Sequence, residues 1–222
     1  MARDRSAPVA PALEKQAADF ASTIQRALNT TICHDAKIQA VVIAKPGHVH
    51  VGHGLTKASP LETRPMPIGI GKGKPRGWMD LSYRLCLDDV GQYLTVVSSF
   101  VAVFADEDGK LCLFHVDYER DKGHGYPDAH LQVYGESAAL DAWQPGQRGL
   151  HKLHFPVGGR RYRPTLEDVI EFLIAEKLAE PAAGWKQAIT TSRDDFHRRQ
   201  LRAAIRRDLE TAKQAVKDFD TT

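Results

Sequence analysis

Residues 80–118 read DLSYRLCL-DDVG-Q-YLTVVSSFVAVFA-DEDG-K-LCLFHVDY. Apolar and polar residues alternate along 80–87, which is the pattern of a strand with one buried face. DDVG and DEDG are turn sequences, and DEDG is typical of a β-hairpin. Residues 93–105 are rich in valine, phenylalanine and threonine, which favour strands. Because short turns join neighbouring strands, the stretch predicts an antiparallel meander.

Further strands are predicted on both sides of this stretch. Residues 38–44 and 48–51 form an apolar pair around the turn Lys45-Pro46-Gly47. Residues 130–134 and 150–155 are shorter candidates after the meander. Residues 52–77 carry glycines, prolines and lysines without periodicity, and they predict a long loop.

Helices are predicted at the two ends of the chain. An apolar stripe at steps of three and four predicts an amphipathic helix ending near Asn29-Thr30. A capping box of Thr165 and Asp168 begins a helical C-terminal third. Ser192 and Asp195 repeat the capping signal for a last helix. Its apolar positions form a heptad seam, which predicts docking on the body or on a second copy of the chain. The seam residues are Leu201, Ile205, Leu209, Ala212, Val216 and Phe219.

These elements predict an α+β fold: an antiparallel β-meander sheet with an N-terminal amphipathic helix and a helical C-terminal third. We expect a disordered N-terminus over 1–10. The N-terminal helix and the sheet then occupy 11–164. C-terminal helices over 165–222 are expected to pack on the sheet domain or extend from it.

Composition favours a protein of the cytoplasm. Hydrophobic residues make up 42% and charged residues 26%, which are ordinary globular values. The three cysteines are widely spaced and without a CxxC pair, which indicates free thiols in a reducing compartment. No secretory leader is evident at the polar N-terminus, and no apolar run reaches membrane-spanning length. We therefore expect no membrane association.

Charge is unevenly distributed although the net charge is only +2. Bases dominate from Lys45 to Arg84, acids dominate from Asp106 to Asp141, and arginines return between Arg193 and Arg207. Separated charges of this kind can steer an anionic ligand such as a nucleic acid.

Strand alternation sorts the histidines into faces. His115 and Asp117 share one face of their strand, and His130 shares a face with Gln132 and Tyr134. In the predicted strand 150–155, Lys152 and His154 share a face, and His151 lies on the other one. If these strands are neighbours, one polar surface collects the candidate catalytic residues His115, Asp117, His130, Lys152 and His154. The loop containing His124 and Tyr126 is expected to cover its edge.

Two histidines can act as general acid and base at neutral pH, and a neighbouring cation can hold a phosphate. That combination suits transesterification of RNA without a metal. In this hypothesis His130 and His154 form the acid–base pair, Asp117 orients one of them, and Lys152 or Arg161 holds the phosphate. No cofactor is expected.

Histidine with carboxylate is also a ligand set for divalent metals, so a metal-dependent enzyme stays an alternative. The same His115 group, or His48, His50 and His53, would supply the ligands. His48 and His50 are two residues apart, and in a strand they would point the same way.

Two basic segments are candidates for contact with phosphates. The run Gly69–Lys74 lacks the spacing of a nucleotide-triphosphate loop, because no serine or threonine follows either lysine. It is either a phosphate contact or a solvated linker. The second segment, 160–163, surrounds a tyrosine with arginines and is either a nucleic-acid contact or a salt-bridged hairpin end. The phosphate-binding candidates are Lys72, Lys74, Arg76, Arg160, Arg161 and Arg163.

Three segments carry a resemblance: HVDYERDKGHGYPDAH at 115–130, LHFP at 153–156 and TLEDVIEFL at 165–173. Together they resemble uncharacterised bacterial proteins, among them small toxin components of toxin–antitoxin loci. The resemblance implies an intracellular, toxin-like or defence-related protein that acts on RNA or on a translation-linked target. Its matching positions are His115, Asp117, His130 and His154.

The sequence leaves open whether the protein is an enzyme. The alternative to a nuclease or other hydrolase is a non-catalytic binding or assembly module for nucleic acid or protein. Expected partners are RNA or another nucleic acid, a cognate protein, and a second copy through the last helix.

Overall fold

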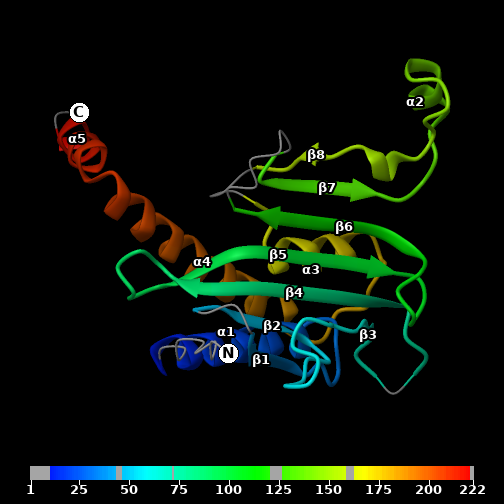
Figure 1. Ribbon diagram of the computed structural model, residues 1–222, viewed down its shortest axis with the longest axis horizontal. Coiled ribbons are helices and arrows are strands. Elements are labelled where there is room, and N and C mark those ends of the chain that lie inside the picture. Colours follow the sequence, from blue (N-terminus) through cyan, green and yellow to red (C-terminus); the bar gives the residue numbers. More distant parts are fainter. Residues whose placement is uncertain (1–10, 44–46, 72, 121–126, 159–162, 221–222) are drawn as a thin grey trace, which may run out of the picture.

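A single antiparallel sheet is the centre of the protein (Figure 1). The structure, a computed structural model, describes residues 11–43, 47–71, 73–120, 127–158 and 163–220. The eight strands follow the order β1-β2-β4-β5-β6-β7-β8, and β3 pairs with β4 beyond the end of β2. The strands are β1 (Ile38–Val42), β2 (Val49–His53), β3 (Met66–Ile68), β4 (Gly77–Leu87), β5 (Leu94–Phe104), β6 (Cys112–Glu119), β7 (Ala129–Val133) and β8 (Phe155–Pro156).

The long strands β4, β5 and β6 confirm the meander predicted from their turns and alternation. Burial along β4 alternates strictly from Gly77 to Leu85, so one side of the strand faces the core. The turn at 106–109 is held by the carboxylate of Asp106, which accepts hydrogen bonds from the backbone N–H groups of Lys110 and Leu111. Gly109 adopts φ 69°, a left-handed conformation that glycine permits at little cost.

Helices cover one face of this sheet. α1 (Pro11–Asn29) buries Leu13, Ala17, Ile24 and Leu28 of its predicted stripe, and it ends where the sequence indicates. α3 (Leu166–Ala175) begins with the predicted capping box of Thr165 and Asp168. The other helical segments are α2 (Ala138–Trp143), the 3₁₀ turn η1 (Leu150–Lys152), α4 (Trp185–Arg207) and α5 (Leu209–Asp220). The core forms between α1, α3 and the apolar face of the strands. An α+β fold is therefore confirmed.

Two predictions about strands and loops are wrong. Residues 150–155 do not form a strand: the chain makes the 3₁₀ turn η1, and only Phe155 and Pro156 pair with β7. The turn is closed locally, because the N–H of Lys152 donates to the carbonyl of Gly149. The long loop over 52–77 contains the short strand β3, which the prolines around it conceal in the sequence.

The expected start of the last helix is also wrong. α4 begins at Trp185, and Ser192 lies inside it, where its hydroxyl donates to the Glu167 carboxylate on α3. The helix breaks at Asp208, whose carboxylate accepts from the N–H of Thr211 at 3.1 Å and caps α5. The heptad seam is thereby divided between two helices. Five of its six residues stay exposed, with 62% for Leu201, 52% for Leu209 and 83% for Phe219.

Within the described residues, no helix has the length and apolar character needed to span a membrane. The cysteines Cys33, Cys86 and Cys112 are free. Burial raises the pKa of the Cys33 thiol to about 12, so this side chain behaves as a small apolar core residue.

Candidate functional site

The strand face opposite the helix-covered core is polar, and the sheet register brings its side chains into rows. We call it the polar face and define it by Ser82, Arg84, Ser98, Phe100, His115, Asp117, Glu119, His130 and Gln132. One row across the strands is Ser82, Phe100, Asp117 and His130, since each is the direct partner of the next. Residues directly opposite each other on neighbouring strands have adjacent side chains. The fold therefore places Asp117 against His130.

His130 is held between two oxygens and a second imidazole. Its side chain is only 3% exposed, and Nε2 lies 3.7 Å from Oδ2 of Asp117. Nδ1 lies 3.4 Å from the carbonyl oxygen of Pro127. The ring of His154 contacts it edge to face, with centroids 4.8 Å apart. Asp117, His130 and His154 thus form one cluster, in which His130 is the inaccessible member and Asp117 is 29% exposed.

His115 belongs to a second, adjoining network. Its Nε2 lies 2.6 Å from Oε1 of Gln132, and Nε2 of Gln132 donates to the carbonyl oxygen of His151 at 2.5 Å. The amide orientation fixes the tautomer: the proton of His115 sits on Nε2 and donates to Gln132, so Nδ1 carries the free lone pair.

The charge state of His115 follows from its surroundings. Burial lowers its pKa below the ordinary 6.5, and the electrostatic effect of His130 and His154 acts in the same direction. The Gln132 hydrogen bond and the Asp117 carboxylate oppose this effect without overcoming it. At neutral pH the ring is therefore a neutral imidazole with an acceptor nitrogen.

Aromatic rings surround this second network. Phe100 lies 5.2 Å from the His115 ring, centroid to centroid, and Tyr134 lies 5.9 Å from it. Tyr134 stacks on His151 with an interplanar angle of 14°. Such rings give a flat base a surface on which to stack.

Only some of the predicted catalytic residues lie together in the structure. His115, Asp117, His130 and His154 come together. Lys152 is exposed on η1 and does not belong to the Asp117–His130–His154 cluster. His151 contacts the His115 network instead, through Gln132 and Tyr134. The prediction for these two residues assumed strand alternation in a segment that is a 3₁₀ turn. His124 and Tyr126 lie outside the described residues.

Sequence reasoning missed Arg84 and Phe100 on the same face. Arg84 lies 3.9 Å from the Glu119 carboxylate, and its Nε is buried without a hydrogen-bond partner. The alternation of β4 already contained the signal, because Arg84 stands between Tyr83 and Leu85, which face the core.

The metal candidates at β2 are engaged separately. Nδ1 of His50 lies 2.8 Å from the carbonyl of Pro60, and Nδ1 of His53 lies 2.9 Å from the carbonyl of Lys37. His48 directly precedes β2. In the part of the chain that the structure describes, no group of three or more His, Cys, Asp or Glu side chains is arranged to hold a metal ion.

Of the basic candidates, Arg76, Arg163 and Lys74 are described by the structure, and none of these three belongs to the polar face. Arg76 pairs with Glu180 at 2.8 Å and donates to the Lys177 carbonyl, which ties its loop to the end of α3. Arg163 lies over the Tyr118 ring at 4.3 Å, on the helix-covered side, and Lys74 is exposed. Lys72, Arg160 and Arg161 lie outside the described residues.

No protein-family model matches the chain, and no curated protein or solved structure matches it either. The resemblance to toxin components therefore stays a prediction.

Proposed function

We propose that the protein acts on RNA at the polar face, by acid–base chemistry on the phosphodiester that needs no metal. The observation that carries this proposal is the meeting of two imidazole networks on one sheet face. His115 is oriented by Gln132, and His154 is backed by the His130–Asp117 pair. Each network holds an imidazole that is only partly buried, and proton transfer to a substrate requires such access.

The roles differ from those expected from sequence. The rings of His130 and His154 touch, so a phosphate does not fit between them. His130 is also inaccessible. We therefore assign His130 and Asp117 as positioning residues. His115 and His154 are the pair that exchanges protons with the substrate.

In this scheme Nδ1 of His115 accepts the proton of the ribose 2′-hydroxyl. The 2′-oxygen forms a bond to phosphorus while the bond from phosphorus to the 5′-oxygen breaks. Protonated His154 donates its proton to the departing 5′-oxygen, which leaves a 2′,3′-cyclic phosphate and a 5′-hydroxyl. The step is specific for RNA because DNA lacks the attacking group. Phe100 and Tyr134 would stack on the flanking bases, and Arg84 would face the phosphate.

The test is cleavage of a single-stranded RNA oligonucleotide, with DNA of the same sequence as control. We expect cyclic-phosphate ends from RNA in buffer containing EDTA, and intact DNA. The double variant His115→Ala, His154→Ala should lose at least about a hundredfold in rate. His34→Ala is the matched control, because His34 is exposed and lies outside the polar face.

A folded double variant that cleaves as fast as the wild type would refute the assignment. Activity that EDTA abolishes and added metal restores would favour the metal-dependent alternative. Growth arrest by the wild type and not by the double variant, on induced expression in bacteria, is the toxin-like outcome.

The exposed seam favours a second candidate function, assembly through α4 and α5. Five of its six apolar residues are at least 41% exposed, and helices with such a stripe commonly pair. Light scattering across a concentration series should show a dimer that the double variant Leu201→Ser, Leu209→Ser converts to monomer. A wild-type protein that stays monomeric throughout the series would exclude assembly.

A further inference from the structure

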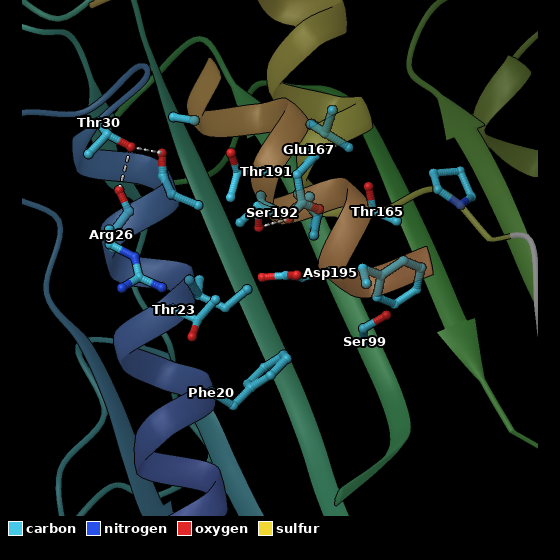
Figure 2. A pocket seen from close by; sticks show the side chains of 18 of the residues that line it. Phe20, Thr23, Arg26, Thr30, Ser99, Thr165, Glu167, Thr191, Ser192 and Asp195 are labelled. Carbon is cyan, nitrogen blue, oxygen red and sulfur yellow. Dashed lines mark hydrogen bonds between the residues drawn. The ribbon is translucent and has the colours of Figure 1, made fainter. Parts of the chain in front are cut away.

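A groove of about 700 Å³ lies on the helix-covered side of the sheet, separate from the polar face. α1 forms one wall and the first half of α4 forms the other, with the start of α3 at one end (Figure 2). Strands β4, β5 and β6 form the floor. Pockets that bury a small ligand have volumes in this range.

The floor and lower walls are apolar. Tyr83, Val101 and Val116 come from the sheet, and Phe20 and Phe196 come from the two helices. Phe20 packs on Tyr83 edge to face, with centroids 5.1 Å apart. Burial raises the pKa of Tyr83, so its phenol is neutral. A hydrocarbon or aromatic body would exchange water for carbon on this floor.

The upper walls are polar, with an excess of cations. Arg26 on α1 (Figure 2) and Arg199 on α4 line opposite walls, and both are exposed. Neither of them is ion-paired with a described carboxylate. Two hydroxyls also line the groove (Figure 2): that of Thr23 on α1 donates to the carbonyl of Asp19, and that of Thr191 on α4 accepts from the Gln187 amide.

The two acids that line the groove are already engaged. Glu167 accepts a hydrogen bond from Ser192, and Asp195 lies 3.7 Å from Arg198. A further cation, Arg163, also lines the groove and lies over Tyr118. The groove therefore offers guanidinium groups to a ligand more readily than it offers carboxylates.

Ion pairs hold the α4 wall in place. Arg193 contacts Glu171 at 2.5 Å and Asp168 at 3.1 Å, which joins α4 to α3. Together with the bond from Ser192 to Glu167, these contacts fix the α4 wall relative to α3 before any ligand enters. Such preorganisation lowers the cost of binding.

We propose that this groove binds a small amphipathic anion. Its apolar body lies on the strand floor, and its negative head lies between Arg26 and Arg199. The site is distinct from the polar face and does not depend on RNA cleavage.

The probe is 8-anilinonaphthalene-1-sulfonate, an aromatic body with one sulfonate. Its neutral counterpart is N-phenyl-1-naphthylamine, which has the same body without the charge. Fluorescence titration of the wild type should show saturable binding of about one sulfonate probe per chain. The double variant Arg26→Ala, Arg199→Ala should raise the Kd of the sulfonate by about tenfold or more, and that of the neutral probe by less than about twofold.

Two controls match these changes. Lys15→Ala, Arg202→Ala removes the same charge from exposed positions of α1 and α4 outside the groove, and should leave both Kd values unchanged. Thr191→Trp fills the groove and should weaken both probes, whereas the adjacent Thr190→Trp should not. A cooperative thermal unfolding curve for each variant excludes dye binding to unfolded chains.

The proposal fails if the wild type shows no saturable binding. It fails equally if Thr191→Trp leaves both probes bound as before. If the arginine variant weakens both probes alike, the assignment of an anionic head is overturned.

Discussion

The two faces of β5 and β6 carry different kinds of structure. On the polar face, His115 and Asp117 meet residues that the sheet register places opposite them. On the groove face, Val116 forms part of a floor whose walls come from α1 and α4, far apart in the chain. The first arrangement is set by strand pairing alone. The second arises only when helices pack on the sheet and leave a gap between them.

A single strand can thus contribute side chains to two sites, one on each face, whose chemistry is independent. His115 and Asp117 of β6 enter the polar networks, and Phe114 and Val116, which alternate with them, enter the core and the groove. Variants on one face should therefore spare the other, whereas a change in the shared core should affect both.

The largest expected effect is loss of both sites together. Leu81 is fully buried on β4, and Leu81→Ala should lower the free energy of unfolding by about 2–5 kcal/mol through the cavity it leaves. Urea denaturation measures the loss, and RNA cleavage and probe binding should fall together near the new midpoint. Leu113→Ala, at an exposed position of β6, should cost about 0.5 kcal/mol or less. Equal costs for the two variants would contradict the placement of the core.

The next largest effect should appear on the polar face alone. Asp117→Asn removes the charge beside His130, so the His130–His154 cluster loses its orientation, and kcat for RNA should fall by up to about a hundredfold. Sulfonate binding in the groove should stay within about twofold. Asp108→Asn, at an exposed turn position outside the polar face, is the matched control. A variant with unchanged kcat would remove Asp117 from the proposed site.

A smaller effect tests the groove side. Thr165→Ala removes the hydroxyl that accepts from the N–H of Asp168, and should destabilise the protein by about 1 kcal/mol. Because Thr165 also lines the groove, probe binding should weaken while the rate of RNA cleavage at saturation holds. Thr165→Ser keeps the cap and should behave as the wild type. Loss of RNA cleavage by the alanine variant alone would show that the faces are coupled.

The smallest effect is a pH dependence of stability. The pKa of His115 is lower in the folded chain than its ordinary 6.5, so the unfolded chain binds the proton more readily. The contribution of His115 to the free energy of unfolding is fully present above about pH 6.5, and it is lost as the pH falls toward the lower pKa of the folded chain. Urea midpoints should thus drop between about pH 7.5 and pH 5.5, by more in the wild type than in His115→Gln. Equal drops would mean that His115 is not the titrating group.

The sequence predicts the polar face well because strand alternation is a local rule. Alternation assigns Asp117 and His130 to faces that meet if their strands are neighbours, and β6 and β7 do pair. His151 and Lys152 could not be assigned in this way, because a three-residue 3₁₀ turn leaves no periodic trace. Strand alternation does not hold at residues 150–152, because the chain forms a 3₁₀ turn there.

The groove could not be predicted, for a different reason. The apolar stripe of α1 indicates that the helix packs, and it does not indicate where the neighbouring helix stands. Ser192 illustrates the difficulty: its spacing to Asp195 fits a cap, yet its hydroxyl reaches Glu167 on another helix. The same residue types form local caps and contacts between helices, so only the folded structure shows which of the two a given hydroxyl makes.

The pairing of β6 with β7 has a consequence for insertions and deletions. Since side chains alternate strictly, one residue added or removed within 114–118 would turn every following side chain to the other face. Asp117 would point toward the groove floor, and an apolar neighbour would face His130. Both sites would be lost in one event, although substitutions affect them separately. A change in the length of the strand should therefore affect both faces, whereas a substitution affects mainly the face that carries it.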